Sequence, residues 1–422
     1  MDFRLLTQLS HVETIAPGRG ATRSPAEARR KQHGRYLSRR QTSDIIGAAL
    51  VALASLANTG KSQRAIPEWS LSAAPLLALG GRGVAAEEFF RIRAVFRLSN
   101  GVVAVLNGGT NEIRLFDEHG RSIRSFGGTG SGPGEFRFIS WAGRSGDTVF
   151  VFDNSLGRIS SVVLRGERRL LGTWPVTARG TRGPLSVEGR LSDGRWLVST
   201  GVSPGWDGPP GVHRLPQSVG IVNADATGEV SWIGEFPSAA FFVFSPTGNI
   251  QQASLGPIAF SPWFYSAASG QHVWLGESGA DSLLHMEFAR GTRATLRLPL
   301  PRRTPPAALI ASGRAREMLA ATTERSRTFA DAKWSSTYLP SALPFFEALV
   351  PGPGGEIWIQ DYAGVSTDSA RYLVVGPDMV ARAWVRVPSG LRVHDVGLDY
   401  VLGVHEDGDG VESVRLYRLS RR

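Results

Sequence analysis

A glycine-rich stretch, Phe126-Gly-Gly-Thr-Gly-Ser-Gly-Pro-Gly-Glu-Phe136, most constrains what this chain can fold into, because it separates two copies of one pattern. The copies are residues 101–113 and 147–159, and they align without a gap. Each has alternating apolar residues, then Asn107 or Asp153, then a turn and an isoleucine. A strand–turn–strand unit that recurs across a glycine-rich link indicates a repeat architecture.

These motifs resemble those of a known class of repeat proteins. The stretch 126–136 resembles the "FGxxGxGPGEF" link between blades of NHL-type and related six-bladed β-propellers, and residues 149–159 resemble their "VxDxxNxRI" core. The resemblance implies an all-β, six-bladed β-propeller of the NHL-like or TolB-like class. It implies no particular activity, because propellers host many unrelated functions.

The rest of the chain can be divided into blades by its alternating apolar residues and its Asn-Gly and Asp-Gly turns. The expected blades cover residues 92–128, 136–176, 184–237, 258–300, 343–388 and 391 onward. The last blade has three strands, and we expect residues 68–79 to add the fourth, which closes the ring and covers an open sheet edge. Residues 305–327 are rich in helix formers and predict a helical insertion between blades four and five.

The N-terminal residues have the pattern of a targeting segment. Residues 1–64 hold eleven Lys and Arg against four Asp and Glu, so they carry most of the net charge of +10. The basic part precedes an apolar run at 45–57, which is shorter than the span of about 20 residues that crosses a membrane. This order is typical of a signal peptide, although a buried helix is the alternative. We therefore expect a leader at 1–64, a propeller at 65–422 without a membrane span, and a periplasmic or extracellular location.

Composition and motif searches narrow the chemistry. The chain has no cysteine, which excludes disulfides, Cys-ligated zinc and thiol catalysis. The eight histidines form no HExxH spacing. The body carries little of the positive charge, which disfavours nucleic acid as a partner. We therefore predict no cofactor, no metal site and no catalytic residue, and we expect a monomer.

Polar residues recur at the end of each second strand. Asn107, Asp153, Asp361 and His405 share this register. Such a ring could bind a metal ion at the end of a channel. We favour a structural role, in which each side chain accepts hydrogen bonds from the backbone of a neighbouring turn.

The long connections are predicted to lie on one face. They are residues 127–135, 202–216, 237–257 and 301–340, whereas the turns on the opposite face are tight. Long loops on a rigid scaffold commonly form a binding face, although surface insertions are tolerated anywhere. Aromatic residues in or beside these connections are the candidate binding residues: Trp206, Trp263, Tyr265 and Trp334. The alternative is that they pack in the core, which is favoured for Trp263 and Tyr265.

These features predict an exported binding module for a protein, peptide or glycan ligand, with its binding face on the side of the long connections. The alternative is a propeller-type hydrolase, lactonase or lyase with its site at the channel mouth. An enzyme is the less favoured interpretation, because no convergent set of carboxylates or histidines is evident in the sequence.

The leader gives the first testable prediction. We expect cleavage near Ala57, so that the mature chain starts near Asn58, because the small residues Ser55 and Ala57 end the apolar run. N-terminal sequencing of the protein from its native host measures this directly. Protein that keeps Met1 would contradict it.

Overall fold

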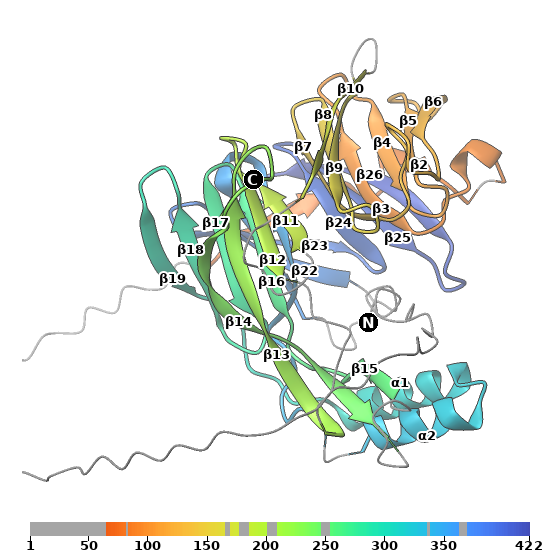
Figure 1. Ribbon diagram of the computed structural model, residues 1–422, viewed down its shortest axis with the longest axis vertical. Helices are drawn as coiled ribbons and strands as arrows, with labels where there is room; N and C mark the ends of the chain where they lie inside the picture. The colour runs from red at the N-terminus through yellow and green to blue at the C-terminus, as the bar shows by residue number, and fades with distance from the viewer. Residues whose placement is uncertain are drawn as a thin grey trace, which may run out of the picture. The chain divides into compact units, whose positions relative to one another are not determined.

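The computed structural model describes residues 65–422, except 82, 165–168, 177–184, 201–208, 246–253, 336–337 and 363–368. The chain divides into two parts, Met1–Ala65 and Ile66–Arg422, and the described strands and helices belong to the second (Figure 1). Trp206 and the apolar run at 45–57 lie outside the described residues.

Consecutive strands pair into antiparallel units, which we number one to six in chain order. Unit one has β3 (Ile92–Arg97), β4 (Val103–Asn107), β5 (Glu112–Phe116) and β6 (Ser122–Gly127). Unit two has β7 (Ile139–Ser145), β8 (Thr148–Asp153), β9 (Arg158–Val163) and β10 (Arg169–Pro175). Unit four has β16 (Phe264–Ser269), β17 (His272–Glu277), β18 (Ser282–Glu287) and β19 (Thr292–Arg297). Unit three has β11 (Leu185–Arg190), β12 (Trp196–Thr200), β13 (Gly211–Val222), β14 (Ser231–Phe244) and β15 (Ser254–Pro257). Units five and six share one sheet, which contains β20 (Phe346–Pro351), β21 (Ile357–Asp361), β22 (Ser369–Val375), β23 (Ala381–Pro388), β24 (Leu391–Val396), β25 (Tyr400–Glu406), β26 (Glu412–Ser420), β1 (Glu68–Leu71) and β2 (Leu77–Leu79).

The tight turn between the first two strands of a unit is built from local sequence. In unit one, Gly101 has φ of 82°, a left-handed conformation that costs glycine little, and its N–H bonds to the carbonyl of Leu98 at 3.0 Å. Apolar and β-branched residues follow, and all of β4 is buried. A strand in which every residue is buried is covered on both of its faces by other parts of the protein.

The core consists of apolar layers between neighbouring units. One cluster of buried side chains lies between each consecutive pair of units, and another lies between unit six and unit one. The first strands make the same circuit: β3 contacts β7, β7 contacts β11, and so on through β16, β20 and β24 back to β3. This arrangement is all-β and propeller-like.

The predicted pairing of residues 68–79 with the last unit is confirmed, in a divided form. Strand β2 pairs antiparallel with β26, where Leu79 lies opposite Val414. Strand β1 pairs antiparallel with the end of β26 and parallel with β23 of unit five. The N-terminal segment therefore covers the edges of both units and joins them into one sheet.

Unit three departs from the prediction, because residues 237–244 and 254–257 are strand rather than loop. Strands β13 and β14 run beyond the unit as a long hairpin, and β15 pairs with the outer end of β14 (Figure 1). The physical reason is the run Ala240–Phe244, whose side chains are mostly buried and whose aromatic and β-branched residues favour strands.

The helical insertion between units four and five is confirmed, but it contains two helices rather than one. They are α1 (Ala307–Ala320) and α2 (Glu324–Lys333), which pack against each other. The chain breaks at Thr323, whose hydroxyl accepts a hydrogen bond from the Ser326 N–H while the Ser326 hydroxyl accepts one from the Thr323 N–H. This capping box starts a second helix inside the segment that we expected to be continuous. Two short 3₁₀ turns, η2 (Ala85–Glu87) and η4 (Pro353–Gly355), complete the elements.

The closing strand gives the second prediction. Leu79 is fully buried between units six and one, so Leu79→Ala leaves a cavity and should lower the free energy of unfolding by about 2–5 kcal/mol. The matched control is Leu76→Ala, because Leu76 is 53% exposed, and we expect it to change stability by less than about 0.5 kcal/mol. Urea denaturation of both variants measures the difference. Equal stabilities would show that β2 contributes little to closure.

Candidate functional site

Bonds between units occur at both ends of the strand circuit. We call one the tight-turn end, where the first strand of each unit turns into the second, and the other the long-connection end. At the tight-turn end, Ser99 of unit one donates its hydroxyl to Asp147 of unit two at 2.6 Å. At the long-connection end, the Phe345 N–H bonds to the carbonyl of Ser278 at 2.6 Å, which joins units four and five.

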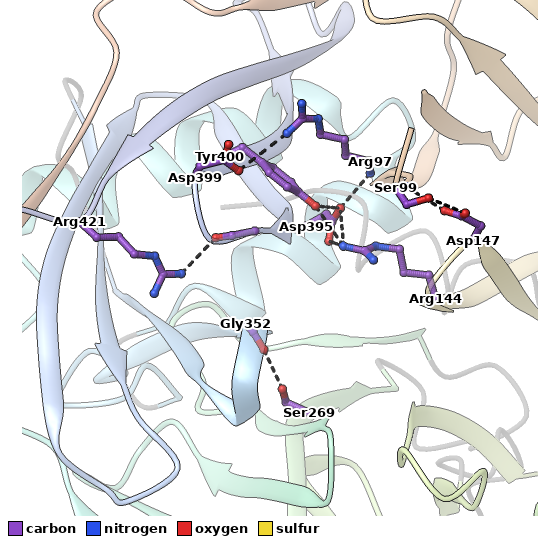
Figure 2. Close-up of polar contacts among 11 residues, drawn as sticks. Arg97, Ser99, Arg144, Asp147, Ser269, Gly352, Asp395, Asp399, Tyr400 and Arg421 are labelled. Carbon is purple, nitrogen blue, oxygen red and sulfur yellow. Dashed lines mark hydrogen bonds and ion pairs between the residues drawn. The ribbon is translucent and has the colours of Figure 1, made fainter. Parts of the chain in front are cut away.

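One carboxylate joins three units at the tight-turn end. Asp395, on β24, accepts hydrogen bonds from the Arg97 backbone at 2.9 Å and from the Arg144 guanidinium at 3.0 Å. Tyr400 donates its hydroxyl to the same carboxylate at 2.9 Å (Figure 2). Because Arg97 belongs to unit one and Arg144 to unit two, this cluster ties units six, one and two together.

The protonation states of the cluster suit this role. Burial opposes the charge of Arg144, but Asp395 and Tyr400 outweigh that effect and raise the pKa of the guanidinium above its usual range. Burial, with the charge of Asp395, raises the pKa of the Tyr400 hydroxyl, so it stays protonated and donates. A buried carboxylate that is fully paired in this way is costly to disturb.

Further contacts at the tight-turn end join other units. The Ser269 hydroxyl of unit four donates to the carbonyl of Gly352 in unit five at 2.8 Å (Figure 2). Arg421 of unit six pairs with Glu356 of unit five at 2.7 Å. The Ser192 N–H of unit three bonds to the carbonyl of Gly270 in unit four at 2.8 Å. The tight-turn end is therefore a network of bonds between units.

At the long-connection end, a hydrogen-bonded relay orients a carboxylate on the first strand of unit five. The Gln360 amide donates to Glu347 at 2.5 Å, and the Tyr372 hydroxyl donates to the Gln360 carbonyl at 2.7 Å. Glu347 occupies a bulge, because β20 and β21 shift register between Phe346 and Ala348. Bulges commonly redirect a side chain beside a functional site.

Two further phenols lie in the field of this carboxylate. Burial, together with the charge of Glu347, raises the pKa values of Tyr265 and Tyr362. Tyr265 lies on β16 of unit four, and its ring is 5.6 Å from that of Phe346, the neighbour of Glu347. Both hydroxyls therefore remain protonated at physiological pH and can donate hydrogen bonds.

The charged residues around the relay are paired. Arg214 contacts Glu277 at 2.6 Å, and Arg371 contacts Asp361 at 3.1 Å. Arg303, which lies just before α1, also pairs with Asp361. The relay, the two phenols and these ion pairs form the candidate site at the long-connection end of units four and five.

The polar residues at the ends of the second strands act structurally in units one and two, as we favoured. Asn107 accepts a hydrogen bond from the Phe90 N–H at 2.8 Å, and Asp153 accepts from the Arg137 N–H at 2.6 Å. Asp361 instead holds two arginines. Across the described part of the chain, no three His, Asp or Glu side chains are placed to share a metal ion.

The structure places the predicted binding residues in different surroundings. Trp334 is only 7% exposed, packs on Phe260, and donates its indole N–H to Glu317 at 2.6 Å. Its burial favours the packing interpretation. Trp263 and Tyr265 are half-buried, just before and at the start of β16. Of the predicted residues, the structure brings Tyr265 to Glu347.

Sequence reasoning missed Glu347 and Gln360. Gln360 lies one residue before the recurring polar position of Asp361, which was the available signal. Glu347 follows no periodic pattern, because the bulge removes it from the alternation of the strand.

Comparison with known proteins gives limited similarity. No family model matches the chain. A 102-residue segment is 31% identical to the RING finger protein nhl-1 of Caenorhabditis elegans, and it spans 24% of this chain and 10% of that protein. Among solved structures, a member of the DUF4221 family from Bacteroides vulgatus is 12% identical with a TM-score of 0.48, covering 84% of this chain and 99% of that chain. Virginiamycin B lyase from Staphylococcus aureus is 11% identical with a TM-score of 0.37, covering 78% and 94%. These similar structures are propeller-type folds, and we transfer no activity from them.

A half-buried acid on the first strand of unit three gives the third prediction. Glu188, on β11, accepts hydrogen bonds from Ser199 at 2.6 Å and from Ser266 of unit four at 3.4 Å, and burial raises its pKa above the usual 4.5. Above pH 4.5 the carboxyl of Glu188 loses its proton more readily in the unfolded chain than in the folded protein. Its contribution to the free energy of unfolding therefore falls as the pH rises from 4.5 through its pKa in the folded protein.

Glu188→Gln should remove this dependence. We expect the variant to match the wild type near pH 4 and to gain stability relative to it as the pH rises to about 8. Urea denaturation across this range measures the difference, with the exposed Glu118→Gln as the control. A constant difference at every pH would show that folding does not raise the pKa of Glu188.

Proposed function

We propose that the six units are the six blades of a propeller, and that the protein is an exported binding module for a protein, peptide or glycan. The circuit of apolar clusters through all six units supports the blade count. The basic and apolar leader supports export. Within the described ranges, no helix is long and apolar enough to cross a membrane.

The observation that carries the proposal is the difference between the two ends. Hydrogen bonds and ion pairs between units tie the tight-turn end together, with Asp395 joining three units. The long-connection end carries the helical insertion, the long hairpin of unit three and the relay at Glu347. A rigid scaffold with its variable segments and its oriented polar groups at one end favours binding there.

We propose that Trp206, Trp263 and Tyr265 contact the ligand, and we assign Trp334 as a packing residue of the helical pair. The assignment of Trp334 follows from its burial among Phe260, Leu309 and Tyr362.

A hydrolase, lactonase or lyase with its site at the long-connection end is the second candidate function. The observation that favours it is the carboxylate of Glu347, since an oriented carboxylate can serve as a general base.

The fourth prediction tests the binding end. The double substitution Trp263→Ala and Tyr265→Ala should weaken ligand binding by more than about 1–2 kcal/mol, because aromatic anchors dominate such interfaces. The measurement is the affinity of the purified protein for ligands found by screening peptide and glycan arrays, with melting temperature as the check on folding.

His119→Ala is the matched control, because His119 is exposed in a tight turn at the opposite end. Binding that falls in the control and not in the double variant would place the ligand at the tight-turn end. Turnover of an array ligand that Glu347→Gln abolishes would favour the enzyme.

A further inference from the structure

The candidate site offers three kinds of group that could meet one ligand. Glu347 supplies a carboxylate acceptor, Gln360 supplies an amide, and Tyr265 supplies a phenol whose raised pKa keeps it a donor. Trp263, two residues before Tyr265, is a half-buried aromatic at the same end. Half-buried aromatic residues keep part of their surface available to a ligand.

The charges around the site balance. Glu277 is paired with Arg214, and Asp361 faces both Arg303 and Arg371. Counted with the carboxylate of Glu347, the groups named here are three acids and three bases. A ligand that approaches this end therefore meets no net charge from these groups, and complementarity favours a neutral ligand.

We propose that this site binds a neutral glycan. A sugar hydroxyl both donates and accepts, so it can donate to Glu347 while a second hydroxyl accepts from Tyr265 or Gln360. The apolar C–H face of a sugar ring can pack on the aromatic faces of Trp263 and Tyr265, as apolar surface generally packs on aromatic rings. This inference rests on the proposed binding function and adds the class of ligand.

The relay behind the carboxylate supports the assignment. Tyr372 is 1% exposed and fully inside the protein, and it holds Gln360, which holds Glu347. The carboxylate is thus oriented before any ligand arrives, which reduces the ordering cost of binding. A fixed acceptor discriminates in favour of ligands with a hydroxyl at the right place. A ligand without that hydroxyl would leave the carboxylate unpaired in the complex, which costs binding free energy.

Charged ligands fit less well. The guanidinium groups of Arg214, Arg303 and Arg371 already face carboxylates, so an anionic glycan or phosphate would have to displace an existing ion pair. A lysine- or arginine-rich peptide would gain from Glu347 but would meet the same three arginines.

The experiment screens the purified mature protein against an array of neutral, sialylated and sulfated oligosaccharides and against charged peptides. The strongest neutral ligand is then titrated by calorimetry into the wild type, Glu347→Gln, Tyr265→Phe and the control His119→Ala. We expect neutral oligosaccharides to bind, with an affinity that changes little between low and high salt. Glu347→Gln should weaken binding by about tenfold or more, because a charge-assisted hydrogen bond is lost.

Tyr265→Phe keeps the ring and removes only the hydroxyl, so it should weaken binding by about two- to tenfold without affecting folding. It therefore tests the inference even if Glu347→Gln unfolds the protein. His119→Ala should bind as the wild type does.

Two results would overturn the glycan assignment and leave the binding end intact. These are selective binding of sialylated or sulfated sugars, and binding of peptides alone with loss of affinity in Tyr265→Phe. Binding that survives every substitution at this end and falls in His119→Ala would overturn both the glycan assignment and the proposed binding end. An array on which no glycan is bound would also overturn the glycan assignment.

Discussion

The pairing of the N-terminal strands with the last strand is the interaction on which the rest of the structure depends. Strand β2 covers β26, and β1 bridges β26 and β23, so the first and last described segments share one sheet. This pairing places Leu79 in the apolar layer between units six and one. Without it, β26 would present an open edge, and the layer that completes the circuit would lose part of its apolar surface.

Side chains reinforce this closure at the tight-turn end. Asp395 gathers groups from units one, two and six, while serine and arginine bonds connect other neighbouring units. These contacts use short turns, which leave little room for insertions. The opposite end therefore carries the segments that vary in length, and its geometry can differ from unit to unit without breaking the circuit.

The sequence predicted the repeated units more accurately than the segments inserted between them. The copies at 101–113 and 147–159 predicted the paired strands and the structural roles of Asn107 and Asp153, because each depends on local spacing. The long hairpin of unit three and the second helix depend on which apolar residues find partners across the fold. The burial of Trp334 could not be predicted from its neighbours in sequence, since Phe260 and Tyr362 are distant from it along the chain.

Strand β21 explains why the candidate site and the helical insertion lie together. Its residue Gln360 holds Glu347, and the next residue, Asp361, binds Arg303 just before α1. Arg303 also donates to the carbonyl of Tyr362, whose ring packs with the helices. Three consecutive residues thus orient the carboxylate, fix the entry of the insertion and form part of its core. Because these residues are consecutive at the end of β21, the position of the helical insertion and the orientation of the Glu347 carboxylate depend on the same strand end.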